Sequence, residues 1–171
     1  PAEVLESVPG VISSQHSGEG KANQYYLRGF NLDHGTDFST VVAGLPVNLP
    51  THAHGQGYSD LNFLFPELVS GVQFRKGPYY AQAVDFSAAG SANINYANVL
   101  AQPTVSASVG QHGWGRVFAA ASPQVAGGHV MAALEVNHNN GPWQQPDDYR
   151  KVNAVLRFSR GATNNAWSVT A

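Results

Sequence analysis

The chain has 171 residues, a length that permits one domain, or one domain and part of another. Only 12% of the residues are charged and the net charge is −2, so the chain lacks the basic surface that nucleic-acid binding requires. It contains no cysteine, which excludes both a disulfide scaffold and a thiolate metal site.

No run of 18 apolar residues occurs, so the sequence predicts no transmembrane helix. The start of the chain also lacks the basic and apolar regions of a signal peptide. Because the chain begins at Pro1, without a Met and at the edge of a predicted helix, we expect that residues upstream have been removed.

The first half is predicted to combine short strands, short helices and Gly-rich loops. Helices are predicted at residues 2–8, at residues 59–65 with Ser59 or Asp60 as the N-cap, and at residues 66–69. Strands are predicted at residues 11–14, 25–30, 39–47, 72–75 and 91–96, and polar loops at residues 15–23 and 49–58.

The second half changes its pattern, because apolar and polar residues alternate from Thr104 onward. A period of two with turn signals between the segments is typical of antiparallel hairpins with one apolar face. We predict a domain at residues 1–98 and four to five strands within residues 99–171, with a short linker at residues 98–103 between the two halves. The predicted apolar face is formed by Val105, Ala107, Val109, Val130, Ala132, Leu134, Val136, Val152, Ala154, Leu156 and Phe158.

Two architectures fit this alternation. A soluble β-sandwich would bury the apolar face against a second sheet. A membrane barrel would expose that face to lipid and direct Glu135, Asn137 and Arg157 towards the lumen. Compact connectors alternate with longer polar ones, and Trp143 and Trp167 lie near predicted strand ends, as expected for an aromatic girdle. The pattern therefore favours the barrel.

Histidines give the predicted loops of the first half their most specific chemistry. His52 and His54 flank Ala53 in one loop, and His16 and His34 lie in two others. Imidazole suits Zn, Cu, Ni and Fe, so a metal or metal-chelate ligand is one hypothesis. Solvated loop histidines are the other, and the pattern alone favours them over direct metal ligation.

No catalytic pattern is recognisable. A His-x-His metallo-hydrolase motif would continue x-Asp-His, whereas this chain continues with Gly55, Gln56 and Gly57. The G-x-S-x-G, H-E-x-x-H and P-loop patterns are also absent. The sequence therefore predicts neither an enzyme nor a bound cofactor.

Five blocks of the first half follow one another in a fixed order. They read YYLRGF from Tyr25, VVAGLPVN from Val41, the Gly/His loop, YSDLNFLFPELVSGVQFRKGPYYA from Tyr58, and DFSAAGSANI from Asp85. In this order they resemble the plug domain of TonB-dependent outer-membrane receptors. The resemblance implies an α+β plug domain with a small mixed β-sheet, followed by antiparallel transmembrane β-barrel strands of an incomplete barrel.

The resemblance implies a receptor of the bacterial outer membrane that actively imports a scarce nutrient, such as a siderophore, a metal chelate or cobalamin. Its partners would be TonB, through an N-terminal box absent from this chain, the lipid bilayer, and a small-molecule or metal-chelate substrate, but no nucleic acid. The alternative is a secreted β-rich ligand-binding or adhesion module, whose strands would fold without detergent.

The resemblance also implies roles for single residues. Arg28 and Lys76 would face carboxylates on the barrel wall and hold the plug in place, and those carboxylates would lie beyond Ala171. We assign Glu67 to the same plug-locking set, although locally it would complement the dipole of a helix start. The substrate-contacting residues would be His16, Asp33, His34, His52, His54, Gln56 and Tyr58.

Overall fold

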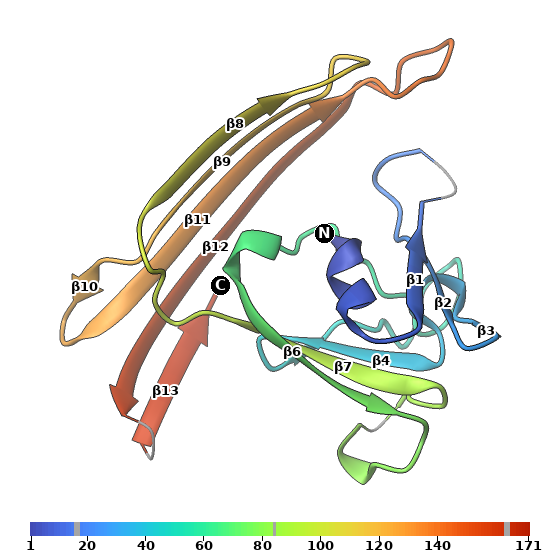
Figure 1. Ribbon diagram of the computed structural model, residues 1–171, viewed down its shortest axis with the longest axis horizontal. Helices are drawn as coiled ribbons and strands as arrows, with labels where there is room; N and C mark the ends of the chain where they lie inside the picture. Colours follow the sequence, from blue (N-terminus) through green and yellow to red (C-terminus); the bar gives the residue numbers. More distant parts are fainter. Residues whose placement is uncertain (16–17, 84, 163–164) are drawn as a thin grey trace. The chain divides into compact units, whose positions relative to one another are not determined.

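The computed structural model divides into two compact units, which are described separately here (Figure 1). It describes the chain except for residues 16–17, 84 and 163–164 and the side chains of residues 162 and 165. Unit 1 is Pro1–Tyr96 and unit 2 is Ala97–Ala171. Among the described residues, no helix is long and apolar enough to cross a membrane.

Unit 1 contains two small sheets and four short 3-10 helices (Figure 1). One sheet has the order β1-β2-β3, and the other has the order β5-β4-β7-β6. The second sheet is mixed, because β4 pairs with β7 in parallel while its other pairings are antiparallel. The elements are η1 Ala2–Ser7, β1 Val11–Ser14, β2 Gln24–Leu27, β3 Phe30–Asn31, η2 Asp33–Gly35, β4 Phe38–Val42, β5 Leu45–Pro46, η3 Pro66–Leu68, β6 Val69–Lys76, η4 Ala81–Ala83 and β7 Gly90–Tyr96.

Two of the strands expected in unit 1 are hairpins. Arg28 and Gly29 have φ of 49° and 88° and form a two-residue turn between β2 and β3. Ala43 and Gly44, with φ of 51° and 86°, do the same between β4 and β5. Positive φ at both central residues matches the twist of the flanking strands, so the chain reverses there. The single strands predicted at residues 25–30 and 39–47 are therefore wrong.

The helix predicted at residues 59–65 is also wrong. The carboxylate of Asp60 accepts a hydrogen bond from the Asn62 amide at 2.8 Å, which closes a local Asx turn in place of an N-cap. The helix predicted at residues 66–69 is confirmed as the single 3-10 turn η3, and the backbone is extended from Val69 onward.

The core of unit 1 gathers side chains from η1, β1, β2, β4, η3 and β7 and from the segments between them. Full burial of one large apolar side chain contributes about 1.5–3 kcal/mol, so these residues supply most of the stabilisation of the unit. The largest of them are Leu5, Tyr25, Leu32, Phe38, Leu61, Leu64, Phe65, Leu68 and Ile94.

Unit 2 is one antiparallel sheet with the strand order β13-β12-β11-β9-β8, and β10 pairs with β11 (Figure 1). The described strands do not close into a barrel. This confirms the predicted antiparallel strands after a domain with a mixed sheet. The strands are β8 Thr104–Val109, β9 Gly115–Ala121, β10 Gln124–Val125, β11 Gly128–Asn139, β12 Tyr149–Ala162 and β13 Asn165–Thr170.

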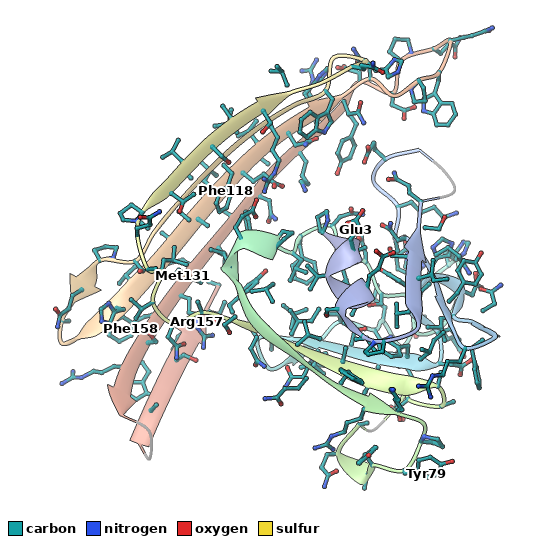
Figure 2. All side chains as sticks on the ribbon, in the orientation of Figure 1. Glu3, Tyr79, Phe118, Met131, Arg157 and Phe158 are labelled. Atoms are coloured by element: carbon teal, nitrogen blue, oxygen red, sulfur yellow. The ribbon has the colours of Figure 1, made fainter. Side chains whose placement is uncertain are left out.

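The two faces of this sheet differ in chemistry. The register places Val136 opposite both Val117 and Val152, so the apolar residues of neighbouring strands form one continuous face. Most large apolar side chains on it are exposed, from 46% at Val136 to 90% at Val109, whereas Val130 and Phe158 are half-buried. The other face contains Phe118 and Met131, which are fully buried and are labelled in Figure 2. Adjacent residues of one strand thus meet different surroundings.

Candidate functional site

Residues 49–58 form the Gly/His loop, which is held in place mainly by backbone hydrogen bonds. The Leu49 amide donates to the Tyr58 carbonyl at 2.9 Å, and the Gly57 amide donates to the Leu49 carbonyl at 2.8 Å. The Ser59 amide donates to the carbonyl of His34 at 2.7 Å. These bonds place the loop against η2, so two segments far apart in the sequence form one site.

Asn48 is the buried residue that joins the two segments. Its side-chain carbonyl accepts from the Thr40 amide at 2.7 Å. Its amide nitrogen lies 3.0 Å from the carbonyl oxygens of Gly35 and Phe38 and 2.9 Å from that of Gly57. A buried polar side chain with partners on three segments specifies one arrangement of the backbone.

Two glycines allow the close approach of these segments. Gly35 has φ of 116°, and a Cβ there would lie 2.4 Å from the Cβ of Ser59. Gly57 has φ of 85°, and a Cβ there would lie 2.7 Å from the ring of Phe86. Both positions require a backbone conformation that L side chains rarely adopt, as well as the space of the missing side chain.

Asp33, His34 and His54 converge at this junction. Their ligand-capable atoms all lie within 4.8 Å of one another. The ring centroids of His34 and His54 are 4.5 Å apart in an edge-on arrangement, and the His54 Nε2 lies 3.8 Å from the Asp33 carboxylate. His34 is buried, whereas the other two side chains are exposed.

His52 and Tyr58 complete the cluster. Their rings stack with centroids 4.0 Å apart, and the Tyr58 hydroxyl accepts a hydrogen bond from the Ala22 amide at 2.8 Å. The Nδ1 of His52 accepts from the His54 amide at 3.2 Å. Since Nδ1 is the acceptor, the proton of a neutral His52 ring lies on Nε2.

The protonation of His34 is set by its surroundings. Its Nδ1 lies 2.7 Å from the Ala22 carbonyl and 3.1 Å from the Asn23 carbonyl, and only an N–H can serve two carbonyl oxygens. Burial lowers the pKa of His34 below its ordinary value, opposed by the hydrogen bond to Ala22 and assisted by nearby His54. A neutral ring with its proton on Nδ1 carries its lone pair on Nε2.

The structure brings together five of the seven residues that we expected to contact substrate: Asp33, His34, His52, His54 and Tyr58. The side chain of Gln56 is exposed, and its carbonyl accepts from the Thr36 hydroxyl at 2.7 Å. His16 lies outside the described residues. The sequence analysis missed Asn48, because its partners are backbone atoms of distant segments, and no motif in this single sequence signals such contacts.

The polar face of the sheet in unit 2 contains a separate charge network. Glu135, which is 1% exposed, lies 2.5 Å from Arg116 and 2.5 Å from Lys151, both on neighbouring strands. Arg157 donates to the Asn98 side chain at 2.9 Å and to the Thr170 hydroxyl at 2.8 Å. Glu135 and Arg157 thus lie on the polar face that the alternation predicts for them.

A family model described as the TonB-dependent receptor plug domain matches residues 1–91, which is more than half of the chain. The chain belongs to this family. The match covers unit 1 almost entirely. It favours the receptor family over the alternative of a secreted β-rich ligand-binding or adhesion module.

Solved structures of outer-membrane receptors share the fold of this chain. The chain is similar to the Pseudomonas aeruginosa receptor FpvA in a complex with a heterologous pyoverdine and iron, at 19% identity and a TM-score of 0.64, over 92% of this chain and 20% of FpvA. It is similar to the siderophore receptor PiuA from Acinetobacter baumannii at 17% identity and a TM-score of 0.62, over 95% and 22% of the two chains.

The iron transporter FrpB from Neisseria meningitidis is a third relative, at 12% identity and a TM-score of 0.65, over 99% of this chain and 28% of that one. The chain therefore spans between a fifth and about three tenths of the length of these three structures. At these identities the likeness concerns the fold.

The three residues that we expected to lock the plug lie on different elements of the plug domain. Arg28 is exposed in the β2–β3 turn, and Glu67 is exposed in η3. Lys76 ends β6, where its ammonium lies 5.5 Å from the centroid of the Phe74 ring. Arg28 is therefore a turn residue, and not part of the single strand predicted at residues 25–30.

Proposed function

We propose that this chain is the plug and the first barrel strands of an outer-membrane receptor that imports a scarce nutrient, such as a siderophore, another metal chelate or cobalamin. One observation carries the proposal: a plug-family domain is followed directly by a sheet with one continuous apolar face and one polar, charged face. Lipid-facing and lumen-facing residues alternate in this way along the strands of outer-membrane barrels.

The proposed membrane orientation follows from the two faces. Large apolar side chains such as Leu134 and Val152 would face lipid, where their exposure to water ends. The network of Arg116, Glu135 and Lys151 would face the lumen, because unpaired charges are costly in hydrocarbon. We therefore assign the protein to the bacterial outer membrane.

The Gly/His loop and η2 are the proposed contact surface for the substrate. The exposed imidazoles and carboxylate beside buried Tyr58 provide hydrogen-bond donors, acceptors and a ring face within a few ångströms. Such a mixture suits a polar, charged ligand such as a chelate. We include Gln56 in this surface, and the role of His16 stays a prediction from the sequence, because that residue lies outside the described part of the chain.

The proposed coupling uses TonB as the partner and the plug as the moving part. Arg28, Glu67 and Lys76 would bind oppositely charged groups of the barrel wall until TonB pulls on an N-terminal segment. Arg28 and Glu67 are exposed and Lys76 is half-buried, which supports such a role, because none of the three side chains is needed to fill the core of the plug.

Uptake measurements test this proposal. Cells that lack the receptor would be complemented with the full-length wild type or with the His52→Ala/His54→Ala variant, and supplied with labelled ferric siderophores, metal chelates and cobalamin. We expect uptake of one of these substrates that requires TonB, and loss of that uptake in the variant at unchanged outer-membrane abundance. Uptake that is equal with and without TonB would overturn the coupling, and normal uptake by the variant would remove the two histidines from the site.

A further inference from the structure

We propose that Asp33, His34 and His54 bind a divalent transition-metal ion directly, through the Asp33 carboxylate and the Nε2 atoms of both imidazoles. The inference names the ligand class of the site and rests on the proposed function only for the claim that the ion is cargo. Two imidazoles and one carboxylate form a ligand set that suits a borderline ion such as Zn²⁺ or Fe²⁺.

The ligand atoms are already almost as close together as a bound ion would require, so only small side-chain movements are needed. In a tetrahedral zinc site with bonds of about 2.0–2.2 Å, neighbouring ligand atoms are about 3.4 Å apart. The His54 Nε2 and the Asp33 carboxylate oxygen are already 3.8 Å apart, and one ligand-capable atom of each of the three residues lies within 4.8 Å of those of the other two. Both of these side chains are on the exposed side of the cluster, so rotation about their side-chain bonds can close the remaining gap.

His34 is held as a ligand in advance. Its Nδ1–H donates to the Ala22 carbonyl at 2.7 Å, which fixes the ring and leaves Nε2 as the coordinating atom. Metal-binding histidines commonly donate their second nitrogen to a backbone carbonyl in this way, since the bond orients the ring and raises its basicity.

The backbone at the site is held in an uncommon conformation. Asp33 and His34 have φ of 29° and 62°, in or near the left-handed region that non-glycine residues rarely occupy. The hydrogen bond from the Ser59 amide to the His34 carbonyl, at 2.7 Å, helps to maintain it. Strained residues of this kind concentrate at ligand sites, because the strain positions their side chains in advance of binding.

His52 is a positioning residue in this account. Its Nδ1 is occupied by the His54 amide and its ring stacks on Tyr58, so it fixes the backbone of the neighbouring ligand. Three protein ligands leave a fourth position of a tetrahedral ion open, as in zinc sites that bind an exchangeable group. Water or a donor atom of a chelator would fill this position.

Zinc titration of the full-length receptor in detergent tests the inference, with isothermal calorimetry as the readout. We expect the wild type to bind Zn²⁺, and His54→Ala and Asp33→Asn each to weaken that binding by about 100-fold or more, since loss of even a residue that only hydrogen-bonds a ligand costs about 10–100-fold. His138→Ala is the matched control, because it removes a histidine of unit 2 that also contacts a carbonyl and lies 3.2 Å from a carboxylate, that of Asp148.

Unchanged affinity in His54→Ala and Asp33→Asn, or an equal loss in His138→Ala, would overturn the metal site. Thermal unfolding midpoints equal to that of the wild type show that a loss of Zn²⁺ affinity does not come from unfolding. Because His52 only positions the neighbouring ligand, His52→Gln should retain more Zn²⁺ affinity than His54→Ala. The outcome is separable from the proposed function: a receptor that fails to bind Zn²⁺ but imports a substrate with TonB refutes only the metal site. Zinc binding without TonB-dependent uptake refutes only the transport proposal.

Discussion

Replacement of Asn48 by alanine is expected to release the Gly/His loop from the rest of the plug. The substitution leaves the Thr40 amide without its acceptor and deprives the carbonyls of Gly35, Phe38 and Gly57 of their donor. An unsatisfied buried polar group costs about 1–3 kcal/mol. The total is smaller than the sum over the four backbone groups, because one amide nitrogen shares its two protons among the three carbonyls. We therefore expect a loss of about 3–5 kcal/mol from the local free energy of opening.

Hydrogen exchange of the full-length receptor measures this loss directly. The reporters are the amides of Leu49, Gly57 and Ser59, which donate within the junction. Because 1.4 kcal/mol corresponds to a factor of ten, a loss of 3 kcal/mol or more accelerates exchange of these amides by about 100-fold or more. Asn48→Asp should do the same, since it keeps the acceptor for Thr40 but turns an anionic oxygen towards the three carbonyls.

Gln73→Ala is the control, because this exposed side chain lies on β6 in the same unit. Exchange at the three reporter amides should be unchanged in that variant. If exchange in Asn48→Ala also remains within a few-fold of the wild type, the buried amide does not hold the loop, and the account of how the site is assembled is wrong.

Three further predictions concern single positions. Gly57→Ala should destabilise the plug in thermal unfolding by more than the ~1–2 kcal/mol that the backbone conformation alone costs, because the new Cβ would clash with Phe86. Gly44→Ala, at a similar φ but with nothing within 4 Å, should show only the backbone cost, and equal losses in the two variants would refute the clash. With chelator present, the proton resonances of His34 should titrate below pH 6.5, and titration above 6.5 would contradict the burial argument. The free energy of unfolding should fall as the pH drops below about 6.5, because the unfolded ring then binds a proton while the folded ring is still neutral. Glu135→Gln should lower the free energy of unfolding of the refolded receptor by about 3 kcal/mol, because Arg116 and Lys151 lose their buried anion. A midpoint of urea unfolding equal to that of the wild type would refute the charge network.

The strands of unit 2 could be predicted because one simple physical contrast repeats along them. Thr104 to Val109 alternate polar and apolar residues at every position, and the register pairs the apolar Val105 and Ala107 with Ala119 and Val117 on β9. The hairpins of unit 1 were missed because Arg28 and Ala43 precede the turn glycines, where Asn or Asp is the usual signal.

The candidate site could be predicted only in part. Histidines in separate loops indicated ligand chemistry, and the structure brings His34, His52 and His54 together. Their arrangement could not be predicted, because it depends on Asn48 and on backbone carbonyls such as that of Ala22, which every residue type carries. A local sequence pattern does not record which distant carbonyl a buried amide will contact.

The most direct test of the receptor account is the environment of two adjacent residues of β11 in the full-length protein in the outer membrane. Spin labels would be attached at cysteines that replace Ala133 and Leu134, whose native side chains are 6% and 50% exposed. Residues 1–171 contain no cysteine, and any cysteine in the rest of the full-length receptor would first be replaced by serine. The account predicts that the label at Leu134 is accessible to oxygen dissolved in lipid, whereas the label at Ala133 is shielded from it. Equal accessibility at both sites, or greater access of a water-soluble nickel complex at Leu134, would contradict a membrane-spanning strand and with it the proposed receptor.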